Sequence, residues 1–439
     1  MKSEKKEEPS HLGNKTNSLY SENKTDSSHL DNKTNSSPLD NKAVSSPSEK
    51  LPIHFRFYKK NSYSYSALLP VVPTADFAKT PLSGIMLYSF FTNQKEDVFE
   101  EVKAARSSHL NAFFIAGGPH PSGAPAETLD YFDAVVIGEG EETLPILISK
   151  IQETGFSDKP LLQKNMQTVP GIAFKNSQNQ MIQTAARLPV NLDCYPCFSA
   201  DNIWRPLEIS RGCPHRCKFC QTPQLFGHQM RHRSVSEIVK YAAYYDDLRF
   251  ISSNAFAYGS NGISAKPEKI KELLSSLSKL EGKRLFFGTF PSEVRPEFVT
   301  EELMDIVQTH CFNDSISIGA QSGSDVILKE ISRGHTAADV YNAAEICFDT
   351  GMTPIVDFII GFPGETLKDQ SLTLDMIDWI CKKGGEVRAH YLTPLPSTDY
   401  ENVVPAKVHP EVSKKLGKLA LGGRLKGVWE NMGSDDGTF

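Results

Sequence analysis

Short apolar runs alternate with amphipathic stretches along most of the chain from Leu51 onward. This pattern is typical of parallel strands joined by helices. In the first part of this region the expected helices cover residues 64–72 and 98–106, with a short one near Leu129 and another from Glu141. The strands between them are "IHFRFY", "GIMLYS", "AFFIA" and "AVVIG". Four β-α units of this kind predict a Rossmann-like parallel sheet.

A second run of units begins at Trp204. Ser234 and Glu237 have the spacing of a capping box, so a helix is expected to start there. The strands are "RPLEIS", "LRFISS", "RLFFGTF", "SISIGA", "TPIVDFII" and "EVRAHYL", and the later helices cover 267–280, 302–309, 338–350 and 367–382. Six strands and five intervening helices predict a partial (β/α)6 barrel.

The predicted fold class is therefore α/β, with a Rossmann-like domain followed by the partial barrel. The first fifty residues are rich in Ser, Asn, Lys and Asp and repeat "NKT" at Asn14, Asn23 and Asn32, with a diverged copy at Asn41. Such a polar stretch predicts a disordered tail. The expected boundaries are a tail over 1–50, the Rossmann-like domain over 51–190, a linker over 191–203, the barrel over 204–395 and a C-terminal extension over 396–439.

Composition narrows the classes of function. The 47 Lys and Arg against 53 Asp and Glu give no general basic field, so nucleic acid is not expected as a partner. No run of about 18 apolar residues occurs and the start lacks the apolar core of a signal peptide, so we expect no membrane insertion and a cytoplasmic location. In that compartment the eight cysteines are expected to be thiols or metal ligands.

Three cysteines are clustered in "RGCPHRCKFC", directly after the first predicted barrel strand. Barrels of this type carry their chemistry on loops at the carboxyl ends of strands. Cys213, Cys217 and Cys220 can together hold a 4Fe-4S cluster and leave one iron open for a small ligand. Zinc is the main alternative, and it would need a fourth ligand such as His215.

The C-x-x-x-C-x-x-C spacing in this position resembles that of the radical S-adenosylmethionine (SAM) enzymes. The resemblance implies that the open iron binds the amino and carboxylate groups of SAM and that one electron cleaves SAM to a 5'-deoxyadenosyl radical. It also implies a reductant such as ferredoxin or flavodoxin. The aromatic Phe219 matches the family residue whose backbone approaches the adenine, although loop packing would explain it equally well.

Other strand ends are similar to the SAM-binding segments of this family. Each also has a plain explanation as a turn or an ion pair. The expected SAM contacts are Gln321 and Ser322 in "GAQSGS", Gly361 and Pro363 in "GFPGET", and Glu293 and Arg295 in "FPSEVRP". The usual glycine-rich segment after the second strand is replaced by "SSNAFAYGS", where Ser253 or Asn254 would take over recognition of the amine.

The segments "IAGGPHPSG" and "VIGEGEET" resemble the cobalamin-binding-like domain of one radical SAM subgroup, an archaeal-type group of unassigned substrate. The family's D-x-H-x-x-G motif is absent, so cobalamin would bind without a histidine ligand, and His120 is not its substitute. Glycine turns and acids at a helix start would also occur in any such fold. The residues matched to cobalamin contacts are Ser89, Gly117, Gly118, Gly138, Glu139 and Gly140.

Cys194 and Cys197 form a C-x-x-C before the barrel that could hold zinc or an auxiliary cluster only with further ligands. Single cysteines at 311, 347 and 381 are expected to be core residues.

Three functions are compatible with these features. The preferred one is a cobalamin-dependent radical SAM enzyme that transfers a methyl group to carbon or rearranges a C–H bond, on a small or macromolecular substrate that the sequence does not identify. The second is a radical SAM methylthiotransferase acting on RNA, suggested by "AQSGSDVILKEISRGHT". That group, however, has three cluster cysteines in its first domain, whereas residues 51–189 contain none. The third is a non-enzymatic cobalamin or redox sensor. A variant of the first function is a radical SAM enzyme whose cobalamin domain is vestigial.

Overall fold

The computed structural model describes residues 50–198 and 206–430. The predicted tail and its "NKT" copies lie outside the described residues apart from Lys50, as do Trp204 and parts of the expected linker and C-terminal extension. From Lys50 onward the described residues form one compact unit. None of the helices in these residues is both long and apolar enough to cross a membrane.

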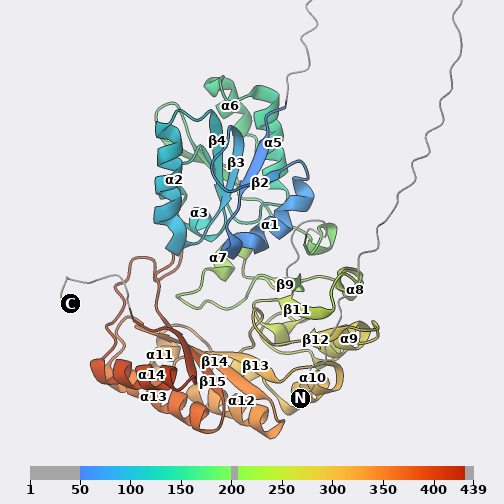
Figure 1. Cartoon of the computed structure of the whole chain (residues 1–439), viewed down its shortest axis with the longest axis vertical. Helices are drawn as coiled ribbons and strands as arrows, with labels where there is room; N and C mark the ends of the chain where they lie inside the picture. The colour runs from blue at the N-terminus through green and yellow to red at the C-terminus, as the bar shows by residue number, and fades with distance from the viewer. Residues whose placement is uncertain (1–49, 199–205, 431–439) are drawn as a thin grey trace, which may run out of the picture. The chain divides into compact units, whose positions relative to one another are not determined.

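The first half of this unit is built on a seven-stranded sheet with the order β2-β1-β3-β4-β5-β6-β7. Figure 1 labels β2, β3 and β4 of this sheet. The first five strands pair in parallel, whereas β6 and β7 are antiparallel to their neighbours. The predicted parallel sheet is confirmed, and β2, β6 and β7 are additions that the sequence pattern did not predict. The strands are β1 (Ile53–Arg56), β2 (Asp76–Ala78), β3 (Gly84–Ser89), β4 (Ala112–Gly117), β5 (Ala134–Val136), β6 (Ile172–Lys175) and β7 (Met181–Gln183).

Helices cover both faces of this sheet, which explains why β3 is buried along its whole length. Helices α1 (Ser62–Leu68), α5 (Thr143–Thr154) and α6 (Lys159–Met166) pack on one face. Helix α2 (Lys95–Ser107) packs on the other face through residues such as Val98 and Val102, which are one helical turn apart. Two short helices, α3 (Pro119–Gly123) and α4 (Pro125–Thr128), follow β4.

The second half contains two parallel sheets, β12-β11-β8 and β13-β14-β15-β16. An isolated parallel bridge links Val294, in the segment after β12, to Ile318 of β13. The two sheets account for the six predicted strands, so the α/β class is confirmed, and β16 is an addition. Among the described residues these strands do not form a continuous closed barrel. The strands are β8 (Leu207–Glu208), β11 (Asp247–Ile251), β12 (Arg284–Phe286), β13 (Ser315–Gln321), β14 (Thr353–Ile360), β15 (Glu386–Tyr391) and β16 (Leu425–Val428).

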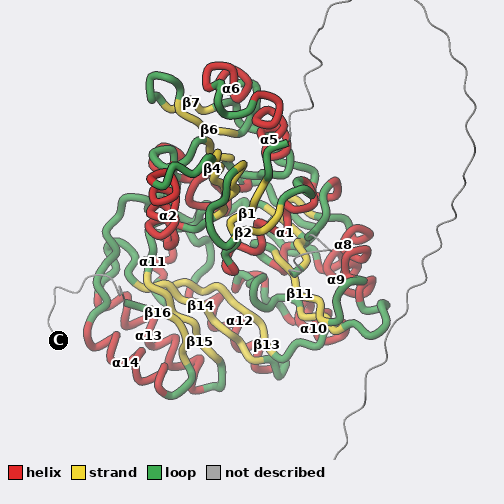
Figure 2. The backbone as a smooth tube through the Cα atoms, turned by 45° about the horizontal axis from the view of Figure 1, so that its top comes forward, coloured by secondary structure: helices red, strands yellow, loops and turns green. Residues whose placement is uncertain are grey.

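Helices alternate with these strands along the chain (Figure 2). Their apolar side chains are buried in a core shared with the strands. Each fully buried Leu or Ile stabilises this core by about 1.5–3 kcal/mol. Ser234 accepts a hydrogen bond from the amide of Glu237, as predicted, but its own amide donates to Asp193, so only half of the capping box forms. The helices are α8 (Val235–Ala242), α9 (Pro267–Leu277), α10 (Glu301–His310), α11 (Asp325–Glu330), α12 (Ala337–Asp349), α13 (Leu367–Lys382) and α14 (Pro410–Leu421).

A two-stranded antiparallel ladder, β9 (Ser210–Arg211) with β10 (Arg231–His232), projects after β8. The segment between the two strands carries the clustered cysteines and helix α7 (Thr222–Phe226).

Candidate functional site

The three clustered cysteines lie in the loop that leaves β9. Gly212 begins this loop with φ of 88°, and a side chain there would overlap a carbonyl oxygen across the loop, so the turn requires glycine. The amide of Cys213 donates to the carbonyl of Gly227 over 3.2 Å, and the amide of Cys220 donates to the carbonyl of Cys217 over 3.0 Å. These bonds hold all three thiols on one compact segment.

The three thiols share one electrostatic environment. Burial raises the pKa of Cys213 and of Cys220, and the neighbouring thiols raise both further. Two guanidinium groups act in the opposite direction: the charge of Arg333 lowers the pKa of Cys220, and the charge of Arg295 lowers the pKa of Cys213. The Nη1 of Arg333 also lies 3.7 Å from Sγ of Cys217. Cations beside three thiols suit an anionic thiolate cluster.

The cysteine loop therefore fits a 4Fe-4S cluster in charge and in number of ligands. In the part of the chain that the structure describes, no three His, Cys, Asp or Glu side chains converge on the position of a single ion. The ligands of a 4Fe-4S cluster each bind a different iron atom, so they are not expected to converge on one point.

Gln321 ends strand β13, close to two other polar side chains. A Cβ on Gly319 would lie 2.8 Å from Nε2 of Gln321, 2.9 Å from Nη2 of Arg333 and 3.3 Å from Oε2 of Glu293. The missing side chain of Gly319 thus leaves the space in which these three side chains meet. Neither Gly319 nor Arg333 was among the predicted site residues, although both lie in sequence stretches that carry the family resemblance.

Ser322 is fully buried and its hydroxyl already has partners within the protein. Its Oγ lies 3.2 Å from Oγ1 of Thr373 and accepts the amide of Ser324 over 3.2 Å. This geometry favours a structural role that fixes the turn after Gln321, rather than the SAM contact we expected.

Glu293 and Arg295 have different partners, and no ion pair joins the two. Arg295 is buried, and its Nε donates to Glu297 over 2.6 Å. Glu293 is partly exposed and lies 3.9 Å from Nη2 of Arg388. Glu293 and Arg295 therefore do not form the pair that we expected to contact SAM together. Arg295 lies near the cysteines, and Glu293 lies near Gly319.

Asn254 and Phe219, two of the expected SAM contacts, have different surroundings. The side chain of Asn254 is buried, and its Oδ1 accepts the amide of Arg295 over 3.4 Å, while its Nδ2 has no hydrogen-bond partner among the described residues. A buried donor of this kind is costly unless a ligand or water accepts its hydrogen bond. The ring of Phe219 packs on Phe362 with centroids 5.7 Å apart, as the packing interpretation expects.

The predicted adenine turn after β14 is held by a buried carboxylate. The amide of Gly361 donates to Oε2 of Glu365 over 2.7 Å, and a Cβ on Gly361 would lie 2.6 Å from the ring of Tyr391. Burial raises the pKa of Glu365 to about 7. Pro363 is half-buried in the same turn.

An acidic group within β14 was missed by the sequence analysis. Oδ2 of Asp357 lies 2.6 Å from Nη2 of Arg388, and the Nε2 of His390 lies 4.0 Å from Oδ1. Burial and then the nearby Glu293 raise the pKa of Asp357 to about 8, although Arg388 opposes this. A single charged residue inside the apolar run "TPIVDFII" was the available signal.

A cavity of about 570 Å³ lies at the carboxyl ends of β3, β4 and β5. This is the edge at which open α/β sheets bind ligands, and the volume is in the range of small-molecule sites. All the residues matched to cobalamin contacts line it: Ser89, Gly117, Gly118, Gly138, Glu139 and Gly140. Its lining also includes residues next to the cysteine loop and at the ends of β11 and β12, among them Arg211, Gly212, Ser253 and Pro291.

The two glycines after β4 have different environments. Gly118 has φ of 91°, and a Cβ there would stand 2.6 Å from Oγ of Ser89, which donates to Ser64. Gly117 would make only ordinary contacts at 3.7 Å or more. The chain itself therefore requires glycine at 118 but not at 117.

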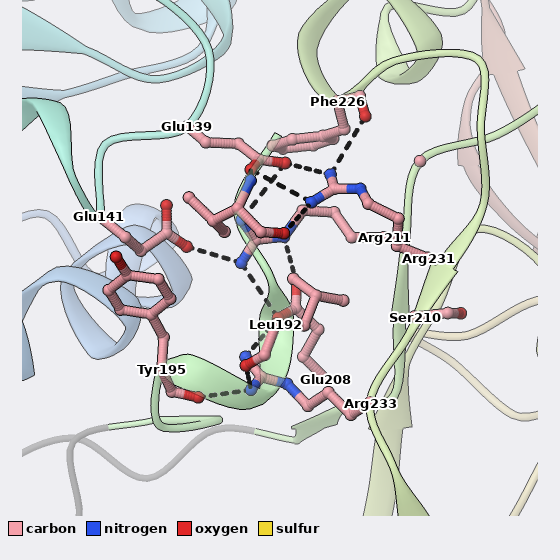
Figure 3. A network of polar contacts seen from close by, with 12 residues as sticks. Glu139, Glu141, Leu192, Tyr195, Glu208, Ser210, Arg211, Phe226, Arg231 and Arg233 are labelled. Carbon is pink, nitrogen blue, oxygen red and sulfur yellow. Dashed lines mark hydrogen bonds and ion pairs between the residues drawn. The ribbon is translucent and has the colours of Figure 1, made fainter. Parts of the chain in front are cut away.

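Glu139 is already paired within the protein. Its Oε2 accepts the amide of Val190 over 2.8 Å, and its other oxygen contacts Arg231 (Figure 3). In the same turn Glu141 lies 2.7 Å from Nη2 of Arg211. The turn that we matched to cobalamin thus joins the sheet to the cysteine loop. The sequence patterns did not single out the two arginines of these pairs, which occur in "SRG" and "RHR".

His120 is buried and is not among the residues that line this cavity. Its Nδ1 lies 3.3 Å from Oγ1 of Thr92, and its Nε2 lies 3.2 Å from Oε2 of Glu127. Both ring nitrogens have neighbours in the protein, in keeping with the expectation that His120 is not a cobalt ligand.

The other five cysteines differ in how far they are buried. Cys197 is buried, with Sγ 3.9 Å from the carbonyl of Glu208, and it also lines the cavity, whereas Cys194 is exposed. Cys311, Cys347 and Cys381 pack in or against the barrel core, as predicted.

The sequence of residues 207–377 matches the model of the radical SAM superfamily. Over these residues the chain is similar to the radical SAM superfamily. The match starts at β8, includes the cysteine loop and ends within α13, so it covers the strands and helices that surround Gly319 and Gln321.

A relative of the chain is a protein of Methanocaldococcus jannaschii with a methylthiotransferase name, which is 26% identical over 308 residues. The alignment covers 65% of this chain and 63% of the relative. The chain thus spans somewhat less than two thirds of the length of this curated relative.

Two solved structures have the same fold over both halves of the chain. The cobalamin-dependent SAM radical enzyme OxsB, with aqua-cobalamin and SAM bound, matches with a TM-score of 0.59 and 19% identity over 75% of this chain and 52% of its own. The radical SAM methyltransferase TsrM of Kitasatospora setae, with cobalamin and a 4Fe-4S cluster bound, matches with a TM-score of 0.58 and 15% identity over 79% of this chain and 76% of its own. At these identities the similarity establishes the fold.

Proposed function

We propose that this chain is a radical SAM enzyme that holds a 4Fe-4S cluster on Cys213, Cys217 and Cys220 and uses cobalamin to transfer a methyl group to carbon or to rearrange a C–H bond. The radical SAM domain implies the cluster and SAM. OxsB and TsrM, which share the fold, have cobalamin bound in their solved structures. We also propose that a ferredoxin or flavodoxin supplies the electron. The proposal leaves the substrate unspecified.

One observation carries this proposal: a single cavity is lined both by the carboxyl edge of the first sheet and by the start of the cysteine loop. Gly117 and Arg211, from the two halves of the unit, line the same space. A ligand held on the sheet edge would therefore be next to a cluster held on the loop. Two cofactors that act on one substrate need such proximity.

The residues of the chain have separable tasks in this scheme. Arg333 and Arg295 supply positive charge beside the three thiolates. Gly319 leaves room for Gln321, which can both donate and accept hydrogen bonds to a polar ligand. When bound, the cluster supplies the electron that cleaves SAM reductively, and cobalamin supplies a methyl carrier.

The test is anaerobic reconstitution with iron and sulfide, followed by incubation with SAM, dithionite and hydroxocobalamin and by mass spectrometry of the products. Formation of 5'-deoxyadenosine supports reductive cleavage, and formation of S-adenosylhomocysteine in addition supports methyl transfer. A reconstituted protein that forms neither product would refute the proposed function. One that forms 5'-deoxyadenosine but retains no cobalamin after desalting would limit it to a radical SAM enzyme with a vestigial domain.

A second candidate is a methylthiotransferase acting on RNA, because the Methanocaldococcus jannaschii relative carries a methylthiotransferase name. That chemistry calls for cluster cysteines in the first domain, and residues 51–189 contain none. Iron quantification separates the two candidates: about four irons per chain support the first, and about eight support the second.

A further inference from the structure

The base of the cysteine loop is attached to the first sheet rather than to the barrel alone. In the β9–β10 ladder Arg231 stands opposite Arg211, so the two strands that begin and end the cysteine segment carry arginines at the same level. Both guanidinium groups contact Glu139 (Figure 3): Nη1 of Arg211 lies 3.5 Å from Oε1, and Nη2 of Arg231 is hydrogen-bonded to it. One carboxylate thus bridges both sides of the loop.

A second carboxylate strengthens this attachment. Glu141 lies 2.7 Å from Nη2 of Arg211, and the side chains of both residues are more than nine-tenths buried. Glu139 and Glu141 come from the turn after β5 in the first sheet, far in sequence from the loop. Because burial removes these charges from water, each guanidinium depends on its carboxylates for compensation.

The same network also connects to the first barrel strand. Glu208 lies 2.7 Å from Nε of Arg211 and 2.8 Å from Nη2 of Arg233. Burial alone would raise the pKa of Glu208, but the two arginines lower it to about 2, so the carboxylate stays charged. The charges of three glutamates and three arginines therefore compensate one another where the first sheet, β8 and the cysteine loop meet.

We propose that Glu139 and Glu141 are positioning residues for the cluster: they hold Arg211 and Arg231 so that the first sheet sets the geometry of the cysteine loop. Arg211 lies two residues before Cys213, separated only by Gly212, which has a positive φ. Since Glu139, Glu141 and Arg211 also line the cavity, a ligand bound there contacts the residues that orient the cluster ligands. This inference rests on the proposed cluster site, but its first test does not need the cluster.

The test compares Glu139→Gln and Glu141→Gln with two controls that also remove a Glu–Arg pair from the first half. Glu142 pairs with Arg187 over 2.6 Å in the same turn, and the partly buried Glu101 pairs with Arg56 over 2.7 Å away from the loop. Hydrogen–deuterium exchange of the full-length apo protein is measured in peptides that cover residues 206–232.

We expect exchange in these peptides to rise roughly tenfold in Glu139→Gln and Glu141→Gln and to stay unchanged in Glu142→Gln and Glu101→Gln. Equal exchange in all four variants would overturn the proposal. If Glu139→Gln loses the whole fold, Glu139→Asp keeps the charge with a shorter reach and is expected to raise exchange in the loop peptides only. A rise spread evenly over the sheet would contradict the proposal.

A double-mutant cycle identifies the contact responsible. If Glu139 acts through Arg231, the effects of Glu139→Gln and Arg231→Gln on loop exchange are not additive, and the double variant resembles either single one. Additive effects would show that Glu139 does not act through this arginine.

The reconstituted protein gives an independent spectroscopic measurement. Glu139→Gln is expected to change the g values and line shape in the electron paramagnetic resonance spectrum of the reduced cluster, while Glu142→Gln leaves them as in the unmodified protein. An unchanged spectrum in a variant with increased loop exchange would overturn the link to the cluster. A protein that shows the exchange effect but binds no cluster would refute the proposed function and leave the attachment of the loop intact.

Discussion

Gly319 and Gln321 are in close contact across one residue of strand β13, since a methyl group on Gly319 would stand 2.8 Å from the side-chain nitrogen of Gln321. Arg333 and Glu293 approach the same point at 2.9 and 3.3 Å. The absence of a side chain at 319 thus determines where a polar ligand can meet these groups, beside the cysteine loop.

Gly319→Ala should therefore weaken SAM binding without affecting the fold. Its φ is not positive, so alanine is compatible with the backbone. The three polar side chains must move by several tenths of an ångström, and we expect the Kd for SAM to rise about tenfold. The measurement is equilibrium dialysis of SAM with the reconstituted protein. Gly417→Ala is the control, because its Cβ would meet nothing within 4 Å. Equal affinities in both variants would contradict the prediction.

Replacement of any one cysteine in the triad should abolish the brown absorbance of the cluster and reductive SAM cleavage. Two thiolates hold the cluster poorly, as the ligand count requires. Cys194→Ala and Cys197→Ala are expected to keep both properties. Since Cys197 is buried, its replacement should still lower stability by about 1 kcal/mol. The check is iron content with absorbance after reconstitution, and a variant of Cys213, Cys217 and Cys220 together that still cleaves SAM would contradict the assignment.

The cysteine triad and the contact between Glu139 and Arg231 show what the sequence can and cannot predict. The cysteine triad can be proposed as a site from the sequence because its three thiols lie within eight residues of one another. The contact between Glu139 and Arg231 joins residues 92 positions apart, so no local pattern reveals it. The same holds for Gly319, whose importance depends on the position of Arg333 in space.

The strands of the fold likewise divide into those that a local sequence pattern predicts and those that depend on distant contacts. Long apolar runs such as "TPIVDFII" predict their strands because a buried parallel strand is apolar along its length. Strands β2 and β7 have three residues each, and β16 is mostly exposed, so their pairing depends on neighbours rather than on their own sequence. Glu139 lines the cavity, and its contact with cobalamin stays a prediction, whereas its pairing with arginines was not predicted.

Asp357 should make the stability of the protein depend on pH. Its pKa is raised to about 8 by burial and Glu293, so folding favours the protonated form. This contribution to stability is fully present below the unfolded pKa near 4 and is lost as the pH rises through about 8. Besides Glu293, the charged groups that face Asp357 are Arg388 and His390, and the pKa of His390 is lowered mainly by burial.

Asp357→Asn should accordingly remove part of the decline in stability between pH 5 and 8. A pKa difference of one corresponds to about 1.4 kcal/mol, so even a fraction of the full effect is measurable. Urea denaturation of the apo protein at several pH values gives the comparison. Asp378→Asn, which removes an exposed carboxylate paired with Lys382, is the control. Parallel curves for Asp357→Asn and the unmodified protein would show that Asp357 does not titrate in this range.

Gly117, rather than Gly118, is the position that tests cobalamin binding. Any side chain at 118 meets Oγ of Ser89 at 2.6 Å and requires a positive φ, so Gly118→Val would destabilise the sheet whether or not a ligand binds. Gly117→Ala adds a methyl group that the protein accommodates, and it is expected to weaken cobalamin binding about tenfold with an unchanged Tm. Titration with hydroxocobalamin followed by desalting and absorbance measures this. Unchanged affinity would show that the corrin does not approach the turn after β4.

His120→Ala should leave the visible spectrum of bound cobalamin unchanged, because the imidazole does not line the cavity and both of its nitrogens lie near protein oxygens, on Thr92 and Glu127. The variant removes a buried ring that packs on Phe90, so its stability should fall by about 1–3 kcal/mol. Thermal unfolding and the spectrum of the loaded protein are measured on the same sample. A spectral shift with an unchanged Tm would identify His120 as a cobalt ligand after all, whereas a lower Tm with an unchanged spectrum is the result that the geometry predicts.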